Sequence, residues 1–206
     1  QISRVESVLT NVWNGVTSAG MSFAVSTEGG DSSDIAPTFG TKAITVAKAH
    51  GTIPVTIEAF EDIDGLTTLL PAMLQDAKDR FEVDKFTDGS GTNEPKGVVA
   101  SVYAESSRRS THSTNSAMTV NDVIDAQNAL GARWQSGASW IGSLTYLNRV
   151  RLLGSASYST WTDRLNEGLG YNIAGKPAYE VSDMSTALSS VTNVAFVYGD
   201  FSNFVI

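Results

Sequence analysis

The chain has 206 residues, a net charge of −8 at pH 7 and no cysteine. The lack of cysteine excludes disulfides, thiolate metal sites and cysteine nucleophiles. A tight nucleic-acid binder normally presents a basic face, which this acidic composition does not provide. Its apolar runs fall well short of the ~20 residues that cross a bilayer, so no membrane partner is expected. A chain of this length buries roughly 70% of its unfolded surface, enough for a sizeable core.

The N-terminal part of the chain predicts a long β-hairpin between residues 12 and 46. Asn14 and Gly15 form a pair that favours tight turns. Phe23 begins a stretch with the period of two that is typical of a strand with one packed face. A polar, glycine-containing break covers residues 28–34. An isolated hairpin is only marginally stable in water, so this one is expected to pack on another surface.

A helix with an apolar stripe is predicted next. The alternating pattern of residues 53–57 predicts a strand before it, and the segment 58–64, which contains four acidic residues, leads into the helix. Proline suits the first turn of a helix and disrupts the interior, so Pro71 predicts a helix start near Leu70. We expect the stripe to be buried core. It consists of Leu66, Leu69, Leu70, Met73, Leu74, Ala77 and Phe81.

The segment after this helix, "GSGTNEPKG", is rich in glycine. A Gly-x-Gly pair can hold a phosphate when it follows a strand. Here the pair follows a predicted helix, and the third glycine of the nucleotide-binding pattern and a Lys-Ser/Thr pair are both missing. We therefore predict a rigid turn whose glycines adopt positive φ. The residues that define the turn are Gly89, Gly91, Pro95 and Gly97.

The following segment predicts a strand and then a capped helix. Residues 98–102 are predicted to be the strand. Thr119 predicts a helix N-cap, because Asp122 follows three residues later in a near capping box. The stripe of this helix that we expect to be buried consists of Val120, Val123, Ile124, Gln127 and Leu130.

The C-terminal part predicts strands on both sides of a helix. Residues 139–143 are predicted to form a strand, and the helix after it is expected to end at Gly154, since glycine commonly ends helices. Gly175, Lys176 and Pro177 predict the turn of a hairpin. Residues 194–198 predict a last strand. Strands and helices together predict an α+β fold.

The residues that usually carry catalysis form no recognisable site. The two histidines, His50 and His112, are far apart and lack metal-ligand spacing. No Gly-x-Ser-x-Gly nucleophile elbow occurs. Arg108 and Arg109 form a basic pair in a Ser/Thr-rich loop, where solvation is the simplest interpretation. We therefore expect no enzyme activity, no cofactor and no metal.

Four segments give the chain a family resemblance when they are taken together and in order. They are "FAVSTEGGDSSDIAPTF" at 23–39, "FTDGSGTNEPKGV" at 86–98, "NIAGKPAYEVSDM" at 172–184 and "FVYGDFSNFVI" at 196–206. This pattern resembles the major capsid protein of tailed double-stranded DNA bacteriophages, whose fold is shared with encapsulin nanocompartments. The resemblance covers nearly the whole chain.

The resemblance implies an α+β phage capsid fold with three parts. These are an extended hairpin loop with flanking strands at 1–49, a peripheral domain with a long spine helix at 50–100, and an axial domain at 101–206. It implies intersubunit contacts in the extended loop at Phe23, Glu28, Gly29, Pro37 and Phe39. It also implies structural turns at Gly89, Gly91, Pro95, Gly97, Gly175, Pro177 and Gly199.

The resemblance also implies a function. A subunit of this family, from a phage or prophage, self-associates into pentamers and hexamers that form an icosahedral shell in the virion. The shell is assembled in the host cytoplasm, with scaffold or portal proteins as possible partners, and encloses DNA without sequence-specific binding. Some members are cross-linked through a lysine of the extended loop. Lys42 and Lys48 lie near that region, but this chemistry is not carried over to them.

Two other interpretations stay open at this point. The first is an encapsulin shell that encloses cargo enzymes. The second is a cell-surface adhesin module, suggested by the Ser/Thr-rich composition, although such modules are usually all-β. Gln1 at the start and the apolar run that ends at Ile206 are further interpreted as signs of a fragment that lacks terminal segments.

Overall fold

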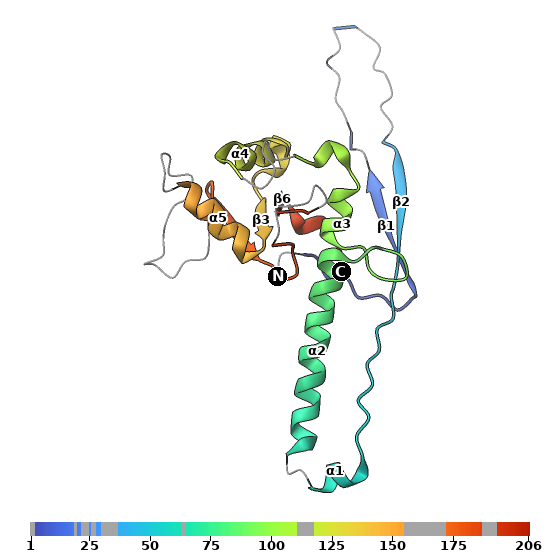
Figure 1. Cartoon of the computed structure of the whole chain (residues 1–206). Coiled ribbons are helices and arrows are strands. Elements are labelled where there is room, and N and C mark those ends of the chain that lie inside the picture. The colour runs from blue at the N-terminus through green and yellow to red at the C-terminus, as the bar shows by residue number, and fades with distance from the viewer. Residues whose placement is uncertain are drawn as a thin grey trace. The chain divides into compact units, whose positions relative to one another are not determined.

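A computed structural model describes most of the chain (Figure 1). It divides into two compact units, which are residues Ser7–Lys48 and residues Gln1–Glu6 with Ala49–Ile206. The described residues are 3–18, 20–21, 25, 28–29, 37–62, 65–110, 118–154, 172–186 and 193–206.

The smaller unit contains a two-stranded antiparallel ribbon. Strand β1 (Val12–Ser18) pairs with strand β2 (Phe39–Thr45), so that Val12 lies opposite Thr45 and Ser18 lies opposite Phe39. The prediction of two paired strands in this region is confirmed. The prediction of a turn at Asn14 and Gly15 is wrong, because both residues lie within β1. Asn14 and Gly15 pair with Ala43 and Lys42 of β2, and this strand pairing outweighs their turn propensity.

The larger unit begins with two helices. Helix α1 (Ile57–Asp62) precedes helix α2 (Leu66–Asp88), which is the long helix in Figure 1. Gly65 lies before α2 with φ 84°, and its carbonyl accepts hydrogen bonds from the backbone N–H groups of Thr68 and Leu69 at 3.0 and 3.1 Å. The helix therefore starts one turn earlier than predicted, and Pro71 lies inside it.

The prediction of a strand at residues 53–57 is wrong. Residues 46–56 have no regular secondary structure, and Ile57 already belongs to α1. Pro54 has no backbone N–H to donate to a neighbouring strand, so this alternating segment is a poor candidate for a sheet.

The strand predicted at 98–102 is also wrong, because α3 (Val98–Tyr103) is a helix. The Gly97 carbonyl accepts hydrogen bonds from the backbone N–H of Ser101 at 3.0 Å and from its hydroxyl at 2.7 Å. Val98, Val99 and Val102 pack against the core, at the i, i+1 and i+4 spacing of one helix face. A 3₁₀ turn (Ser106–Arg108) follows.

The capping box predicted for the next helix is confirmed at α4 (Val120–Asn128). The backbone N–H of Thr119 donates to the Asp122 carboxylate at 2.7 Å, and the Thr119 hydroxyl accepts from the Asp122 N–H at 3.4 Å. Only part of the predicted stripe is buried, since Val123 is inside whereas Ile124 is 43% exposed. A 3₁₀ turn, η2 (Ala132–Trp134), lies after α4.

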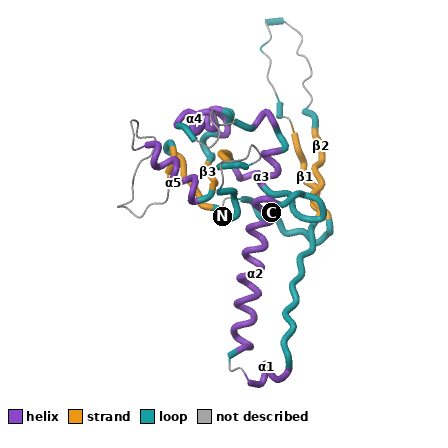
Figure 2. The backbone as a smooth tube through the Cα atoms, in the orientation of Figure 1, coloured by secondary structure: helices purple, strands orange, loops and turns teal. Residues whose placement is uncertain are grey.

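A four-stranded sheet forms the centre of the larger unit, with helices α3, α4 and α5 around it (Figure 2). Its order is β4-β5-β3-β6, in which β3 and β5 are parallel and the other pairs are antiparallel. The strands are β4 (Asn172–Ile173), β5 (Lys176–Glu180), β3 (Ser139–Gly142) and β6 (Phe196–Gly199). Helix α5 (Leu144–Gly154) follows β3, as predicted, and the 3₁₀ turn η3 (Phe201–Asn203) follows β6.

The hairpin predicted near residue 175 is present as β4 and β5. Its turn residues are Ala174 and Gly175, both with positive φ (49° and 76°), which matches the right-handed twist of a two-residue hairpin. The turn therefore lies slightly earlier than predicted, because Lys176 and Pro177 already belong to β5.

The core lies on both sides of β3. Trp140 belongs to one cluster, in which its ring packs on Tyr198 with centroids 4.3 Å apart and its N–H donates to the Ile173 carbonyl at 3.1 Å. The next residue, Ile141, belongs to a second cluster with Phe201. Since successive side chains of a strand point to opposite faces, β3 is buried on both of its faces.

Candidate intersubunit surfaces

The ribbon has one face without any charged residue. Residues that lie opposite each other across an antiparallel pair share a face, so alternate positions of β1 and β2 form one surface. All of its members are exposed, and Val16 (75%) and Phe39 (68%) are exposed most strongly among its large side chains. We call this surface the uncharged face, and it consists of Val12, Asn14, Val16, Ser18, Phe39, Thr41, Ala43 and Thr45.

On the other face of the ribbon, one side chain covers a glycine, while Thr17, Gly40, Lys42 and Ile44 are exposed. Trp13 is half-buried, and its ring lies over Gly15, which is buried in consequence. A Cβ at residue 15 would overlap the ring. Lys42, the partner of Gly15 across the ribbon, gives this face a charge that the uncharged face lacks.

Two of the five contact residues implied by the resemblance fall on the ribbon or directly before it. Phe39 is the first residue of β2, and Pro37 lies half-buried just before it. Glu28 and Gly29 are exposed in a turn, where Gly29 has φ 84°. Phe23 lies outside the described residues. Among those that are described, no hydrogen bond or ion pair joins Glu28 or Gly29 to Phe39.

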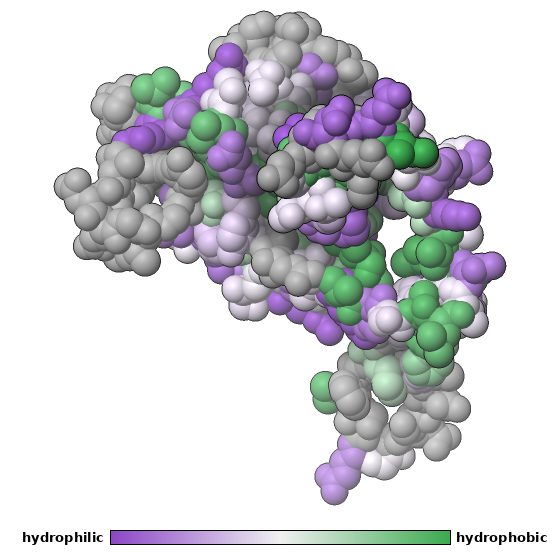
Figure 3. Space-filling view, turned by 90° about the horizontal axis from the view of Figure 1, so that it is seen from below, coloured by the Kyte–Doolittle hydropathy of each residue, from purple (hydrophilic) through white to green (hydrophobic). Residues whose placement is uncertain are grey.

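The apolar stripe of α2 is exposed, so the prediction that it is buried core is wrong for the single chain. Met73 is 53% and Leu74 44% exposed, and Thr87 near the C-terminal end is the buried residue of the helix. Only that end of α2 packs closely on α3. Figure 3 shows hydrophobic residues at the surface of the molecule among hydrophilic ones. A stripe of this kind has the same sequence pattern whether it packs inside one chain or between chains.

Several charged residues of α2 pair with each other on the helix surface. The Arg80 guanidinium lies 2.6 Å from the Asp76 carboxylate, and the Lys78 ammonium lies 2.8 Å from that of Glu82. Both pairs have the i,i+4 spacing that brings side chains together on a helix surface. The apolar stripe itself carries no charge.

The turn after α2 brings its glycines into close backbone contact. The prediction of positive φ holds for Gly91 (80°) and is wrong for Gly89 (−56°) and Gly97 (−66°). The Gly97 N–H donates to the Gly89 carbonyl at 2.8 Å. A Cβ at residue 97 would come within 2.5 Å of the Thr87 carbonyl oxygen and 2.6 Å of the Gly89 nitrogen. The chain approaches itself too closely there for any side chain.

Glu94 links this turn back to the helix. Its carboxylate accepts a hydrogen bond from the Ser90 N–H at 2.9 Å and lies 3.0 Å from the Lys85 ammonium. The backbone donor of Ser90, with the Ser90 hydroxyl and Lys85, lowers the pKa of Glu94 to about 2. Sequence analysis missed this role, because no spacing rule connects a turn carboxylate with the lysine of a preceding helix.

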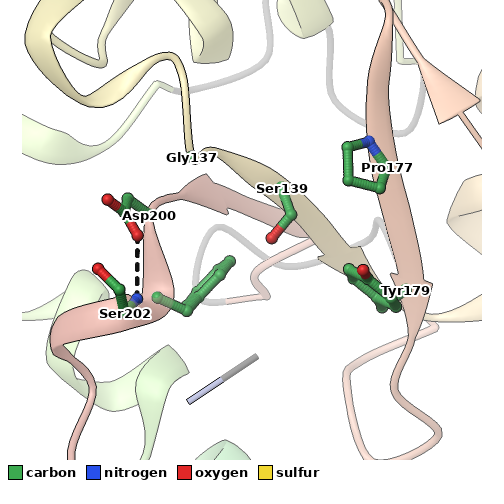
Figure 4. A pocket seen from close by; sticks show the side chains of 7 residues that line it. Gly137, Ser139, Pro177, Tyr179, Asp200 and Ser202 are labelled. Atoms are coloured by element: carbon green, nitrogen blue, oxygen red, sulfur yellow. Dashed lines mark hydrogen bonds between the residues drawn. The ribbon is translucent and has the colours of Figure 1, made fainter. Parts of the chain in front are cut away.

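The larger unit also has an open hollow of about 350 Å³ beside the sheet. Figure 4 shows Asp200 and Ser202 on one side of it, Pro177 and Tyr179 on β5, and Ser139 on β3. The Ser202 N–H donates to the Asp200 carboxylate at 3.0 Å and lowers the pKa of that carboxyl. Asp200 thus caps η3, and the described residues that line the hollow include no histidine or second carboxylate that could form a catalytic pair with it.

The described residues contain no group of three or more histidine, aspartate and glutamate side chains that could hold a metal ion. His50 is exposed, and His112 lies outside the described residues. In the part of the chain that the structure describes, no helix is long and apolar enough to cross a membrane.

Comparison with known proteins shows which family the chain belongs to. The model of the phage capsid family matches residues 1–206, the whole of the sequence. The chain belongs to the phage capsid family. As a member, it is a structural capsid subunit, and the resemblance inferred from the four segments is confirmed.

Solved capsid structures share the fold of this capsid protein. One is described as the capsid of a native GTA particle computed with C5 symmetry, with a TM-score of 0.83 and 20% identity over 98% of this chain and 72% of that chain. Another, the capsid of an empty GTA particle, has a TM-score of 0.80 and 19% identity over the same shares. The α+β capsid fold expected from the sequence is confirmed. No curated protein matches the sequence.

Proposed function

We propose that this capsid subunit associates with its own copies into pentamers and hexamers, which close into an icosahedral shell around double-stranded DNA. One observation supports the proposal. The chain belongs to a capsid family, and as a single chain it leaves apolar surfaces exposed. A single soluble chain seldom exposes apolar patches of this kind without a partner. The neighbouring capsids with C5 symmetry agree with pentamers.

In this proposal each of the three parts expected from the sequence has its own role in assembly. Residues 1–49 form the extended loop that binds a neighbour, 50–100 the peripheral domain with α2, and 101–206 the axial domain around the capsomer axis. Within the loop, Phe39 and Pro37 are proposed contact residues, together with Phe23, Glu28 and Gly29. The rigid glycine turn after α2 would fix the direction of the helix in this scheme.

The interior of the proposed shell faces DNA but does not bind it tightly. The net charge of −8 repels phosphates, so the wall encloses the genome without sequence-specific contacts. The proposed location is the virion, after assembly in the host cytoplasm with the aid of scaffold or portal proteins. The proposed role is structural and involves no enzymatic activity or cofactor, because the chain belongs to a capsid family.

The two other interpretations are not favoured. An encapsulin would share the fold, but the matching family is that of phage capsids. An adhesin module would be all-β, whereas the described chain contains helices such as α2 and α5.

The proposed function is tested by separating folding from assembly. Phe39→Asp is expected to leave the thermal melt nearly unchanged, because Phe39 is exposed in the single chain. It is expected to block assembly, because the new charge would be desolvated in a subunit contact without a partner. Thr17→Asp, on the other face of the ribbon, serves as the control. Sedimentation velocity that shows equal assembly of both variants would overturn the proposed role of Phe39.

A further inference from the structure

Ser139 carries a hydroxyl that has no hydrogen-bond partner among the described residues. The residue is only 6% exposed, and it lies at the start of β3, where it lines the hollow beside the sheet. Figure 4 shows the hydroxyl pointing into the hollow between Asp200 and Tyr179. Buried polar groups almost always have a hydrogen-bond partner in a folded protein. A hydroxyl of this kind therefore indicates a place where a bound molecule supplies the partner.

The Asp200 carboxylate offers a second acceptor to the same hollow. Its Oδ1 accepts from the Ser202 N–H at 3.0 Å, whereas no described residue donates to Oδ2 or forms an ion pair with it. Lys176 on β5 donates instead to the Ser136 carbonyl at 3.3 Å. Space beside Oδ2 depends on Gly137, because a Cβ there would stand 3.3 Å from this oxygen. A carboxylate oxygen without a cationic partner, at the edge of a hollow, suits a positively charged donor.

The residues that line the hollow favour an organic cation over a metal ion. Ca²⁺ takes about six to eight oxygen ligands, usually with several carboxylates, whereas Asp200 is the one carboxylate among the described lining residues. Tyr179 and Phe201 also line the hollow, and aromatic rings attract ammonium and guanidinium groups. The volume of about 350 Å³ lies in the range of pockets for small ligands.

The arrangement of the acceptors favours an ammonium group over a guanidinium group. An ammonium has three separate N–H donors, which can reach acceptors on two different strands. A guanidinium binds most strongly when its planar fork takes both oxygens of one carboxylate. One oxygen of Asp200 is already engaged by Ser202, so the fork would have to compete with the cap of η3.

We propose that this hollow binds an alkylammonium group, which donates hydrogen bonds to the Asp200 carboxylate and the Ser139 hydroxyl while its chain packs against Tyr179. A free amine and a lysine side chain of a second copy present the same chemistry, and the experiments below tell these two sources apart. The net charge of −8 attracts either of them. The site goes beyond the proposed function, which does not depend on it.

An NMR titration of the full chain with butylammonium chloride tests the site. We expect saturable shifts of the backbone amides of residues 137–142 and 199–203. Butanol, which has the same alkyl chain without the charge, is expected to give no saturable shift. Calcium chloride is the probe for a metal site, and it is expected to shift these amides only at higher concentrations than butylammonium.

Two substitutions in the hollow probe the two acceptors separately. Asp200→Asn is expected to raise the dissociation constant of butylammonium at least about 10-fold, because it removes the charge while asparagine still caps a helix N-terminus well. Ser139→Ala is expected to raise it about 3-fold through the lost hydrogen bond. Asp183→Asn is the matched control, since Asp183 is exposed and does not line the hollow, and it is expected to leave binding unchanged.

The source of the ammonium group is found by sedimentation velocity in a buffer free of amines. If Asp200→Asn and Ser139→Ala weaken self-association, the group is a lysine of a second copy. If they lose butylammonium binding but associate as wild type does, it is a free amine. Either result supports the site, provided that both variants keep the wild-type thermal melt.

Four outcomes would overturn the proposal. These are saturation by butanol as readily as by butylammonium, saturation by calcium at lower concentrations, equal weakening by Asp183→Asn and Asp200→Asn, and unchanged butylammonium binding in a folded Asp200→Asn variant. Capsomers or shells of the wild-type protein seen by electron microscopy in the same amine-free buffer would leave the proposed function standing in each of these cases.

Discussion

The indole of Trp13 lies over Gly15 so closely that a Cβ at residue 15 would overlap the ring. The two residues are separated by one position of β1, so the Trp13 side chain and the side of Gly15 where a Cβ would stand belong to the same face of the ribbon. Glycine within a strand usually costs stability, but here it provides the space in which the ring packs. This contact buries Gly15, while Thr17, Gly40, Lys42 and Ile44 on the same face stay exposed.

Gly15→Ala is therefore expected to displace the ring and to destabilise the ribbon by about 1 kcal/mol or more. Gly40→Ala on the same face is expected to be milder, because its Cβ would meet the Thr17 hydroxyl, a side-chain group that can rotate away. NMR checks the Gly15→Ala prediction, since the Trp13 ring is expected to shift the Hα resonances of Gly15 in the wild type. An unchanged Trp13 indole resonance in Gly15→Ala would contradict the packing described.

The turn after α2 gives a second prediction. Gly97→Ala is expected to lower the free energy of unfolding by about 3 kcal/mol, because the methyl group would collide with backbone atoms of Thr87 and Gly89 that cannot rotate away. Gly199→Ala is the matched control, since nothing lies within 4 Å of a Cβ built there, and it should stay within about 0.5 kcal/mol of wild type. Urea unfolding of both variants compares them, and equal midpoints would refute the close approach.

The lowered pKa of Glu94 predicts that the stability of the fold depends on pH. Folding lowers the pKa of its carboxyl from 4.5 to about 2, so the ionised form stabilises the fold above pH 4.5. This contribution is lost as the pH falls from about 4.5 to about 2. Glu94→Gln should therefore melt below wild type at pH 7, and the difference should shrink toward pH 2. The exposed Glu180→Gln is the control, and a difference for Glu94→Gln that stays constant between pH 7 and pH 2 would argue against the link to Ser90 and Lys85.

Burial sets apart two leucines with similar sequence patterns. Leu147→Ala, in the fully buried cluster beside Trp140, should cost about 2 to 5 kcal/mol through lost burial and a cavity. Leu74→Ala should cost less than about 1 kcal/mol in the free subunit, because Leu74 is half exposed. Denaturant melts of free subunits measure both. A loss at Leu74 as large as that at Leu147 would mean that the stripe is buried within the chain.

The sequence predicts some parts of the fold better than others. Local signals were sufficient where short-range chemistry decides the structure, as in the capping box of Thr119 and Asp122. They failed where valines at 98–102 satisfied a strand pattern and a helix face equally well. In that case the hydrogen bonds from Ser101 to the Gly97 carbonyl favour the helix.

The candidate surfaces were harder to predict than the elements that carry them. A stripe such as that around Leu74 is apolar at helical spacing whether its partner is the same chain or a neighbour. The contact of Trp13 with Gly15 depends on a side-chain position that no spacing rule encodes. Family resemblance supplied the expectation that surfaces of this kind exist, and the structure supplied their exposure and charge.

The central claim is that the chain builds a capsid by association with its own copies. Negative-stain electron microscopy of the purified protein, with sedimentation velocity on the same sample, tests it most directly. The account predicts capsomers with five-fold or six-fold symmetry, or closed shells, that grow with protein concentration. A folded protein that stays monomeric at every concentration and salt condition would contradict it.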